Sequence, residues 1–121
     1  MKNNLDKPVH KDSRGEIRRF DFGGAKFNVL FTKKGALRSG DVHPMRQFDI
    51  ILKGKFEITM RQGNKNVKIT KGANEFVVIP PNTPHLFEAL ENTVAIEWWD
   101  GPFSVEYYEP YRKLVEEQPN K

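Results

Sequence analysis

Two short stretches decide how this chain folds: Asp-Val-His-Pro-Met-Arg-Gln at residues 41–47 and Pro-Pro-Asn-Thr-Pro-His at residues 80–85. Residues at i and i+2 of a strand share a face, so Asp41 and His43 can point into one cavity, and Gln47 returns after a short connection that contains proline. His85 would have to arrive from a strand much further along the chain. Carboxylate, imidazole and amide donors suit one divalent ion such as Mn, Fe, Ni or Zn better than copper(I) or calcium.

The composition favours a single domain. At 121 residues the chain is long enough for one packed core and too short for two ordinary domains. It has no cysteine, which excludes disulfides, thiolate zinc sites and cysteine nucleophiles. No apolar stretch approaches the ~20 residues that span a bilayer, and the first residues lack the apolar region of a signal peptide. We therefore expect one domain over residues 1–121, in the cytoplasm and without a membrane partner.

The net charge of +4 does not indicate nucleic-acid binding, because the basic residues are dispersed among sixteen acidic ones. A protein that binds RNA or single-stranded DNA would show a basic stripe with interleaved exposed aromatic residues, and none is visible here. We expect no nucleic-acid partner. A small anionic molecule makes simpler use of a mild positive charge.

The rhythm of the sequence predicts an all-β fold. Short segments rich in Val, Ile, Phe and Thr alternate with Gly, Asn, Asp and Pro, which is typical of a sandwich or barrel of six to nine antiparallel strands. The predicted strands cover residues 16–20, 26–32, 38–43, 47–52, 55–61, 64–70, 75–79, 85–90 and 93–99. The barrel would span about residues 16–100, with Ile58 and Val78 among its core residues.

Only the tail, at about residues 105–118, is predicted to be helical. Pro110 can open a helix, and Tyr111, Leu114 and Val115 then follow at i, i+3 and i+4. These three residues would present one apolar stripe to the barrel.

The two stretches resemble the paired motifs of the cupin family, in the form of a single-domain, cupin 2 type jelly-roll barrel. The first cupin motif ends in His-x-His-x3–4-Glu-x6-Gly, and this chain has Asp41-x-His43-x3-Gln47-x6-Gly54. The second carries Pro-x-Gly-x2-His, and the chain has Asn82 in the glycine position, between Pro80 and His85. Asparagine is the best non-glycine residue for left-handed backbone, so that difference is physically small.

The resemblance implies that Asp41, His43, Gln47 and His85 are metal ligands. Asp41 stands where cupins usually have histidine, and Gln47 where they usually have glutamate, although some cupins that act on sugar acids use glutamine there. Two histidines and one carboxylate are also the ligand set of non-haem iron oxygenases. Without a metal, Asp41 could instead orient one of two hydrogen-bonded histidines at the barrel rim.

A second resemblance lies near the N-terminus, where Asp-x-Arg-Gly at residues 12–15 is similar to the opening of cupins that epimerise or isomerise nucleotide deoxysugars. In those families the matching arginine lies near the sugar nucleotide, which makes Arg14 a candidate substrate contact. The alternative is a surface turn before an edge strand.

Alternation along the predicted strands gives further candidates for the lumen. If Gln47 points inward, so does Asp49, and a carboxylate within an apolar strand needs a partner or a ligand. Glu97 and Trp99 would share one face of their strand, and Phe87 would share the face of His85. We therefore take Asp49 and Glu97 as candidate catalytic residues, and Phe87 and Trp99 as candidate substrate contacts.

Two classes of function remain open. The first is a metal-dependent enzyme that isomerises, epimerises or otherwise processes a small carbohydrate-like substrate, with an iron dioxygenase as a variant. The second is a non-catalytic module that binds a sugar or a metal. The family resemblance also implies a homodimer.

Overall fold

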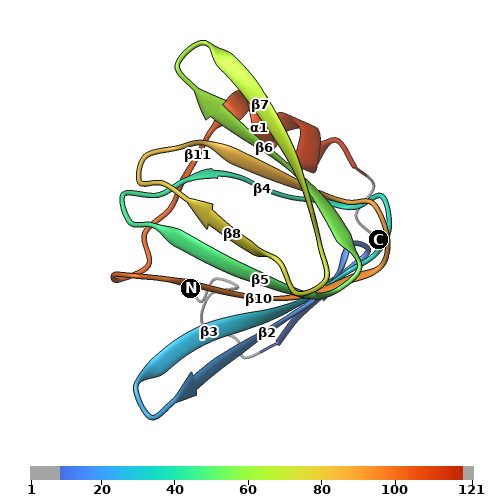
Figure 1. Cartoon of the computed structure of the whole chain (residues 1–121), viewed down its shortest axis with the longest axis vertical. Coiled ribbons are helices and arrows are strands. Elements are labelled where there is room, and N and C mark those ends of the chain that lie inside the picture. Colours follow the sequence, from blue (N-terminus) through green and yellow to red (C-terminus); the bar gives the residue numbers. More distant parts are fainter. Residues whose placement is uncertain (1–8, 119–121) are drawn as a thin grey trace.

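Two antiparallel sheets form the molecule (Figure 1). The computed structural model describes residues 9–118. One sheet has six strands in the order β1 (Val9–Asp12), β2 (Gly15–Phe22), β3 (Ala25–Thr32), β10 (Thr93–Trp99), β5 (Gln47–Lys53) and β8 (Phe76–Ile79). The other has five, in the order β11 (Glu106–Tyr107), β4 (Leu37–Val42), β9 (His85–Ala89), β6 (Lys55–Gln62) and β7 (Lys65–Gly72).

All nine predicted strands are present, and the sequence interpretation missed two. The missed strands are β1, which pairs with β2, and the two-residue β11, which pairs with β4. The described residues therefore form eleven strands rather than six to nine. Both missed strands are short and polar, so they lack the apolar alternation on which the prediction rests.

The apolar core fills one end of the space between the sheets. Its buried members are Ile51, Phe56, Ile58, Met60, Val77, Ile79, Phe87, Ala89 and Ala95. The prediction for Ile58 is confirmed, because none of its surface is exposed. The prediction for Val78 is wrong, since 51% of its surface is exposed. Val77 and Ile79 point inward on β8, so Val78 between them points out.

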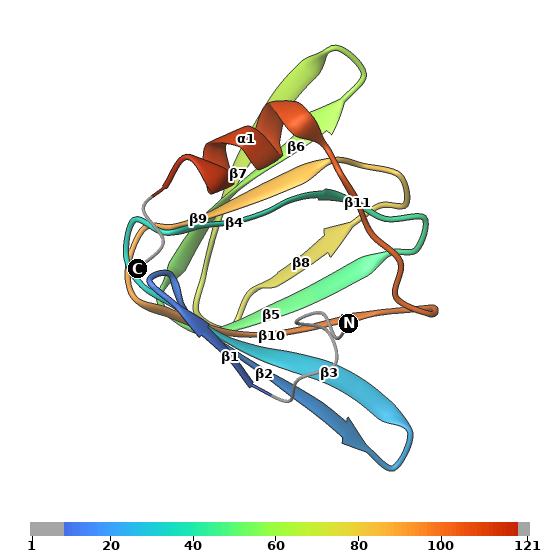
Figure 2. The same ribbon diagram turned by 180° about the vertical axis from the view of Figure 1, so that it is seen from behind.

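The helix α1 (Glu109–Glu116) packs on the outer face of the five-stranded sheet (Figure 2). It begins at Glu109 with Pro110 in its first turn, so the predicted helix is present, but residues 106–107 of the predicted helical tail form β11 instead. Tyr111 and Val115 are buried against Leu86 of β9. Leu114, which we expected in the same stripe, is 43% exposed because the helix rests on the sheet along one narrow row.

The two sequence stretches are joined through a tight turn at Asn82. Asn82 has a left-handed φ of 56°, as its glycine-like position predicted. Its backbone N–H donates to the carbonyl oxygen of His43 at 2.6 Å. This bond connects the end of β4 directly to the turn that precedes His85. Within residues 9–118, no helix has the length and apolar character needed to cross a membrane.

Candidate metal centre

Asp41, His43 and His85 meet at one end of the barrel interior. Asp41 belongs to β4, His43 follows that strand, and His85 is the first residue of β9. One ligand atom from each side chain lies within 4.8 Å of the other two. The two histidines are buried, with 3% and 0% of their surface exposed. Two motifs far apart in the sequence are thus brought to one point.

Backbone carbonyl groups fix how the two imidazoles are protonated. Nδ1 of His43 lies 3.0 Å from the carbonyl oxygen of Ser104, and Nδ1 of His85 lies 3.0 Å from that of Thr83. A carbonyl oxygen only accepts hydrogen bonds, so each Nδ1 carries the proton and each Nε2 keeps a free lone pair. This is how the second ring nitrogen of a metal-binding histidine is usually held.

The atoms that face one another lack partners. Among the described residues, Nε2 of His43, Nε2 of His85 and Oδ1 of Asp41 are buried and have no hydrogen-bond partner. Buried polar atoms are nearly always satisfied, so three such atoms at one point need an explanation. A divalent cation would satisfy all three at once.

Burial also keeps the histidines in the form that binds a metal. It lowers the pKa of His85 to about 4 and lowers that of His43 in the same direction, so both rings are neutral at pH 7. Burial raises the pKa of Asp41 to about 6, which leaves that carboxyl mostly ionised at pH 7. The donor set at neutral pH is therefore two neutral imidazoles and one carboxylate.

A bulge in β4 aims Asp41 inward. In the pairing with β9, Ser39 and Asp41 face consecutive residues, so Gly40 is an extra residue. Ser39 and Gly40 both have left-handed φ values, 78° and 72°. Without the extra residue, Arg38 and Asp41 would lie on opposite faces of the sheet. With it, both line the same cavity.

Solved structures of similar shape were found, although no family model and no curated protein sequence matches the chain. A deletion mutant of oxalate decarboxylase OxdC from Bacillus subtilis aligns with a TM-score of 0.75 over 95% of this chain and 32% of that one, at 16% identity. A tryptophan-to-phenylalanine mutant of the same enzyme aligns with a TM-score of 0.74 over 85% and 30%, at 17% identity. The capsular polysaccharide assembling protein CapF from Staphylococcus aureus aligns with a TM-score of 0.67 over 86% and 33%, at 22% identity.

These neighbours are cupin jelly-roll proteins. The chain has the cupin fold. The predicted all-β jelly roll with a short C-terminal helix is therefore confirmed. The chain spans about a third of the length of these neighbours, and at these identities the likeness establishes the fold alone.

Gln47, the fourth predicted ligand, is tied into a polar network of the cupin barrel. Its Nε2 donates to Oδ1 of Asp49 at 2.8 Å and to Oε2 of Glu97 at 3.4 Å. Its Oε1 accepts a hydrogen bond from Nε1 of Trp99 at 3.2 Å. Gln47 lines the same cavity as Asp41, and its role as a ligand stays a prediction.

Asp49, which is buried, and Glu97, which is partly buried, form a pair of carboxyl groups. They lie directly opposite each other in the pairing of β5 with β10, and Asp49 is 1% exposed. Burial, followed by the nearby charge of Glu97, raises the pKa of Asp49 well above its usual range. Burial also raises the pKa of Glu97, although Asn28 donates to its Oε1 at 3.3 Å. The pair therefore keeps a proton to a higher pH than ordinary carboxyl groups do.

The three predicted substrate contacts line one cavity of about 540 Å³, together with Asp41, Gln47 and Glu97. Phe87 and Trp99 come from β9 and β10, and Arg14 comes from the turn between β1 and β2. Arg14 donates from Nη2 to Oδ2 of Asp12 at 2.6 Å. Their contact with a substrate stays a prediction.

Among the residues of this cavity that the sequence interpretation missed are Arg19, Arg38 and Phe103. Phe103 packs on the ring of His43 with 5.5 Å between centroids, and it follows the last long strand, where no pattern marked it. Arg38 lies three residues before Asp41, so strict alternation puts it on the opposite face. Only the adjacent Ser-Gly pair at residues 39 and 40 could have indicated a bulge.

Proposed function

We propose that this cupin domain binds one divalent first-row metal ion through Asp41, His43 and His85, with Gln47 as a fourth ligand. We further propose that it isomerises or epimerises a small carbohydrate-like molecule. One observation carries the metal site: two buried Nε2 atoms and one carboxylate oxygen converge, and none of the three has a protein partner among residues 9–118. Two imidazoles, a carboxylate and an amide suit Mn, Fe, Ni or Zn.

The surrounding residues fit proton transfer. When bound, the ion would polarise a carbonyl or hydroxyl oxygen of the substrate. Burial raises the pKa of both Asp49 and Glu97, which supports a role for this pair as the group that moves the proton, since such a group works best with a pKa near the operating pH. Gln47 donates to both carboxyl groups and so holds them in place.

The substrate class is supported by the cavity and by one neighbour. A volume of about 540 Å³ with aromatic and charged walls fits a small polar molecule. Trp99 and Phe103, with ring centroids 4.5 Å apart, offer an aromatic surface beside His43 on which a sugar ring could lie. CapF, one of the structural neighbours, is a capsular polysaccharide assembling protein.

The metal site is tested by elemental analysis of the purified protein and its histidine variants. We expect about one ion per chain in the unchanged protein and almost none in His43→Gln. His10→Gln is the matched control, because His10 bonds to Asp12 rather than to the cluster, and it should keep its ion. Equal metal content in both variants, or none in the unchanged protein after it is offered each metal, would refute the site.

Turnover is tested by proton NMR in heavy water. An isomerase or epimerase with this proton-transfer pair should introduce solvent deuterium into a sugar or sugar acid, and Asp49→Asn should reduce that rate at least ~100-fold. A protein that binds the ion and a sugar without exchange would instead be a binding module.

Oxygen chemistry is the second candidate, and the two-histidine, one-carboxylate ligand set favours it. Substrate-dependent oxygen uptake by the iron-loaded protein, with no deuterium exchange, would replace the isomerase proposal with a dioxygenase.

We also propose a homodimer, which the outer face of the six-stranded sheet supports. That face exposes apolar side chains on β3, β5 and β8: Phe31, Leu52, Phe76 and Val78 are 39%, 47%, 66% and 51% exposed. Such a patch is uncommon on a monomer. Light scattering of Phe76→Glu tests the proposal, with Phe22→Glu as the control. Phe22 is 81% exposed at the end of β2, so only Phe76→Glu should yield monomers. A monomeric unchanged protein would refute it.

A further inference from the structure

The cavity that holds Asp41 carries an excess of positive charge. Its lining includes four arginines, at positions 14, 19, 38 and 112, and only two carboxyl groups, Asp41 and Glu97. Even when both carboxyl groups are ionised, the four guanidinium groups outnumber them. An arginine is charged at every physiological pH, so this excess persists.

Two of the four arginines are already neutralised. Arg14 pairs with Asp12 at 2.6 Å, and Arg112 pairs with Glu116 at 3.2 Å. These ion pairs account for the charge of both side chains.

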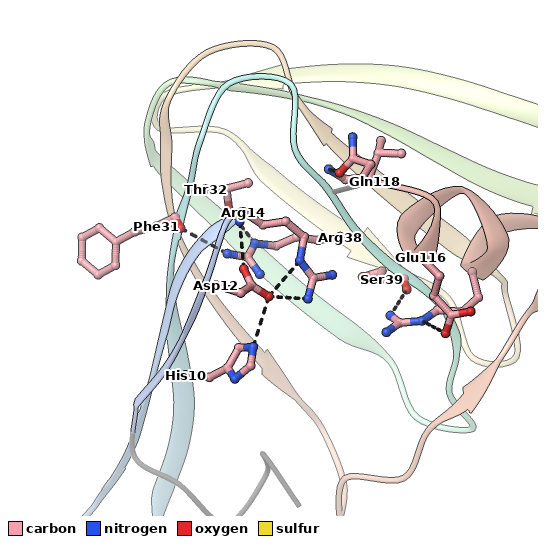
Figure 3. Close-up of polar contacts among 11 residues, drawn as sticks. His10, Asp12, Arg14, Phe31, Thr32, Arg38, Ser39, Glu116 and Gln118 are labelled. Atoms are coloured by element: carbon pink, nitrogen blue, oxygen red, sulfur yellow. Dashed lines mark hydrogen bonds and ion pairs between the residues drawn. The ribbon is translucent and has the colours of Figure 1, made fainter. Parts of the chain in front are cut away.

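Arg38 is different, because only neutral groups hold it. Its Nε donates to Oγ1 of Thr32 at 2.7 Å, and its Nη2 donates to the carbonyl oxygen of Phe31 at 3.2 Å (Figure 3). It is 6% exposed, and no carboxylate of the described chain lies within 4.0 Å of it. The charges of Asp12 and Glu97 act on it only from a greater distance, and Asp12 is bonded to Arg14.

Arg19 lines the same cavity and, like Arg38, has no ion-pair partner among the described residues. Its Nη1 is buried without a hydrogen-bond partner, and within the described chain Arg19 forms no ion pair at 4.0 Å or less. Its neighbour Arg18 instead points outward and pairs with Glu16. Of these adjacent residues of β2, Arg18 therefore has an ion-pair partner, whereas on Arg19 the charge of Glu97 acts only from beyond 4.0 Å.

A buried charge without a partner is costly, so buried charges in proteins are usually paired with an opposite charge. A guanidinium group has five N–H donors, and Arg38 uses two of them on Thr32 and Phe31, which leaves three. Donors arranged as a planar fork match the paired oxygens of a carboxylate or phosphate.

We infer that Arg38 and Arg19 form an oxyanion subsite, and that the molecule in this cavity carries a carboxylate or phosphate group. The inference rests on the proposed function in one respect, namely that this cavity is the substrate site. It does not require that a metal is bound. It narrows the proposed substrate from a carbohydrate-like molecule to an anionic one, such as a sugar acid or sugar phosphate.

The test uses full-length protein stripped of metal, so a failed metal site cannot affect it. The arginine Nε–H signals are followed by nitrogen–proton NMR while acetate, inorganic phosphate or neutral acetamide is added. We expect saturable shifts of the Arg38 and Arg19 signals with acetate or phosphate and none with acetamide. The anion with the lower Kd identifies the group that the subsite prefers.

Variants decide whether these arginines carry the binding. Arg19→Gln should raise the Kd of the preferred anion at least fivefold, whereas Arg18→Gln, the adjacent outward control, should leave it within twofold. Arg38→Gln should abolish binding. Because that change also removes the bonds to Thr32 and Phe31, Arg19→Gln keeps the test decisive if Arg38→Gln does not fold. Absence of saturable shifts with both anions, or equal Kd values for Arg19→Gln and Arg18→Gln, would overturn the inference.

Discussion

The two halves of the barrel interior differ in kind although the same strands build both. On β5, Ile51 lies in the apolar half and Gln47 in the polar half, and on β9 the same holds for Ala89 and His85. The apolar half consists of side chains whose burial stabilises the fold. The polar half holds buried atoms without partners, which cost stability. The comparison indicates that the apolar half stabilises the fold, whereas the polar half binds a ligand at a cost in stability.

The largest expected effect comes from the apolar half. Ile58→Ala removes a fully buried side chain and should lower the free energy of unfolding by about 2–5 kcal/mol. Chemical denaturation measures this loss, and metal content should be unchanged. Leu114→Ala is the control, because Leu114 is 43% exposed and its loss should change stability by less than about 0.5 kcal/mol. Loss of the ion from folded Ile58→Ala would show that the halves are not independent.

Residues of the polar half should dominate how the stability of the metal-stripped protein depends on pH. His85 has a folded pKa of about 4 against an ordinary value of 6.5, so the unfolded chain binds more protons between these values and stability falls as the pH falls through them. Asp41 has a folded pKa of about 6 against 3.8, so its contribution has the opposite sign and grows as the pH falls. Each contribution is on the order of 3 kcal/mol.

Two variants separate these opposing contributions. Between pH 6.5 and pH 4, Asp41→Asn should lose more stability than the unchanged protein, because it lacks the compensating proton uptake. His85→Gln should lose less. Denaturation curves at several pH values check both, and parallel curves for the two variants would contradict the assignment.

A smaller effect is expected at Gly40, where the bulge directs β4 toward the polar half. A Cβ there would lie 2.6 Å from Cα of Arg112, and the φ of 72° disfavours any side chain. Gly40→Ala should therefore cost about 1–3 kcal/mol and reduce metal affinity. Gly63→Ala is the matched control, with a φ of 63° and no atom within 4 Å of the added Cβ. Equal losses of stability in Gly40→Ala and Gly63→Ala would mean that the left-handed φ, and not the contact with Arg112, causes the loss.

The smallest effect on stability is expected at His85 itself. In the metal-stripped protein, His85→Ala should lower the free energy of unfolding by less than Ile58→Ala does, because it removes a buried group whose Nε2 lacks a partner. The same variant should lose its bound metal. Calorimetry and elemental analysis on the same samples compare the two properties. If His85→Ala unfolds while the stripped unchanged protein stays folded, His85 is a structural residue.

Much of the fold could be predicted because alternation is a local property. The inward positions of Gln47 and Asp49 followed from counting residues along one strand, and the left-handed turn at Asn82 followed from one residue type. The exposure of Val78 could not be predicted, because a short apolar strand gives no indication of which face is inward.

Part of the candidate site could be predicted from the sequence, and part could not. The convergence of Asp41, His43 and His85 was anticipated from motif spacing. Arg38 was missed because the bulge at Gly40 reverses the alternation of β4, and that reversal depends on how β4 pairs with β9 and packs under α1.

The C-terminal segment contacts β4 at successive points, and this ties the helix to the cluster. Ser104 holds the ring of His43, Tyr108 donates its backbone N–H to the carbonyl oxygen of Gly40 at 2.8 Å, and Nη1 of Arg112 donates to that of Ser39 at 2.9 Å. Local opening of the segment from Ser104 to Arg112 would therefore release both the bulge and the ring of His43. Amide hydrogen exchange in α1 should therefore slow when a metal ion binds to Asp41, His43 and His85. Exchange at the outer surface of the molecule would then report on binding in its interior.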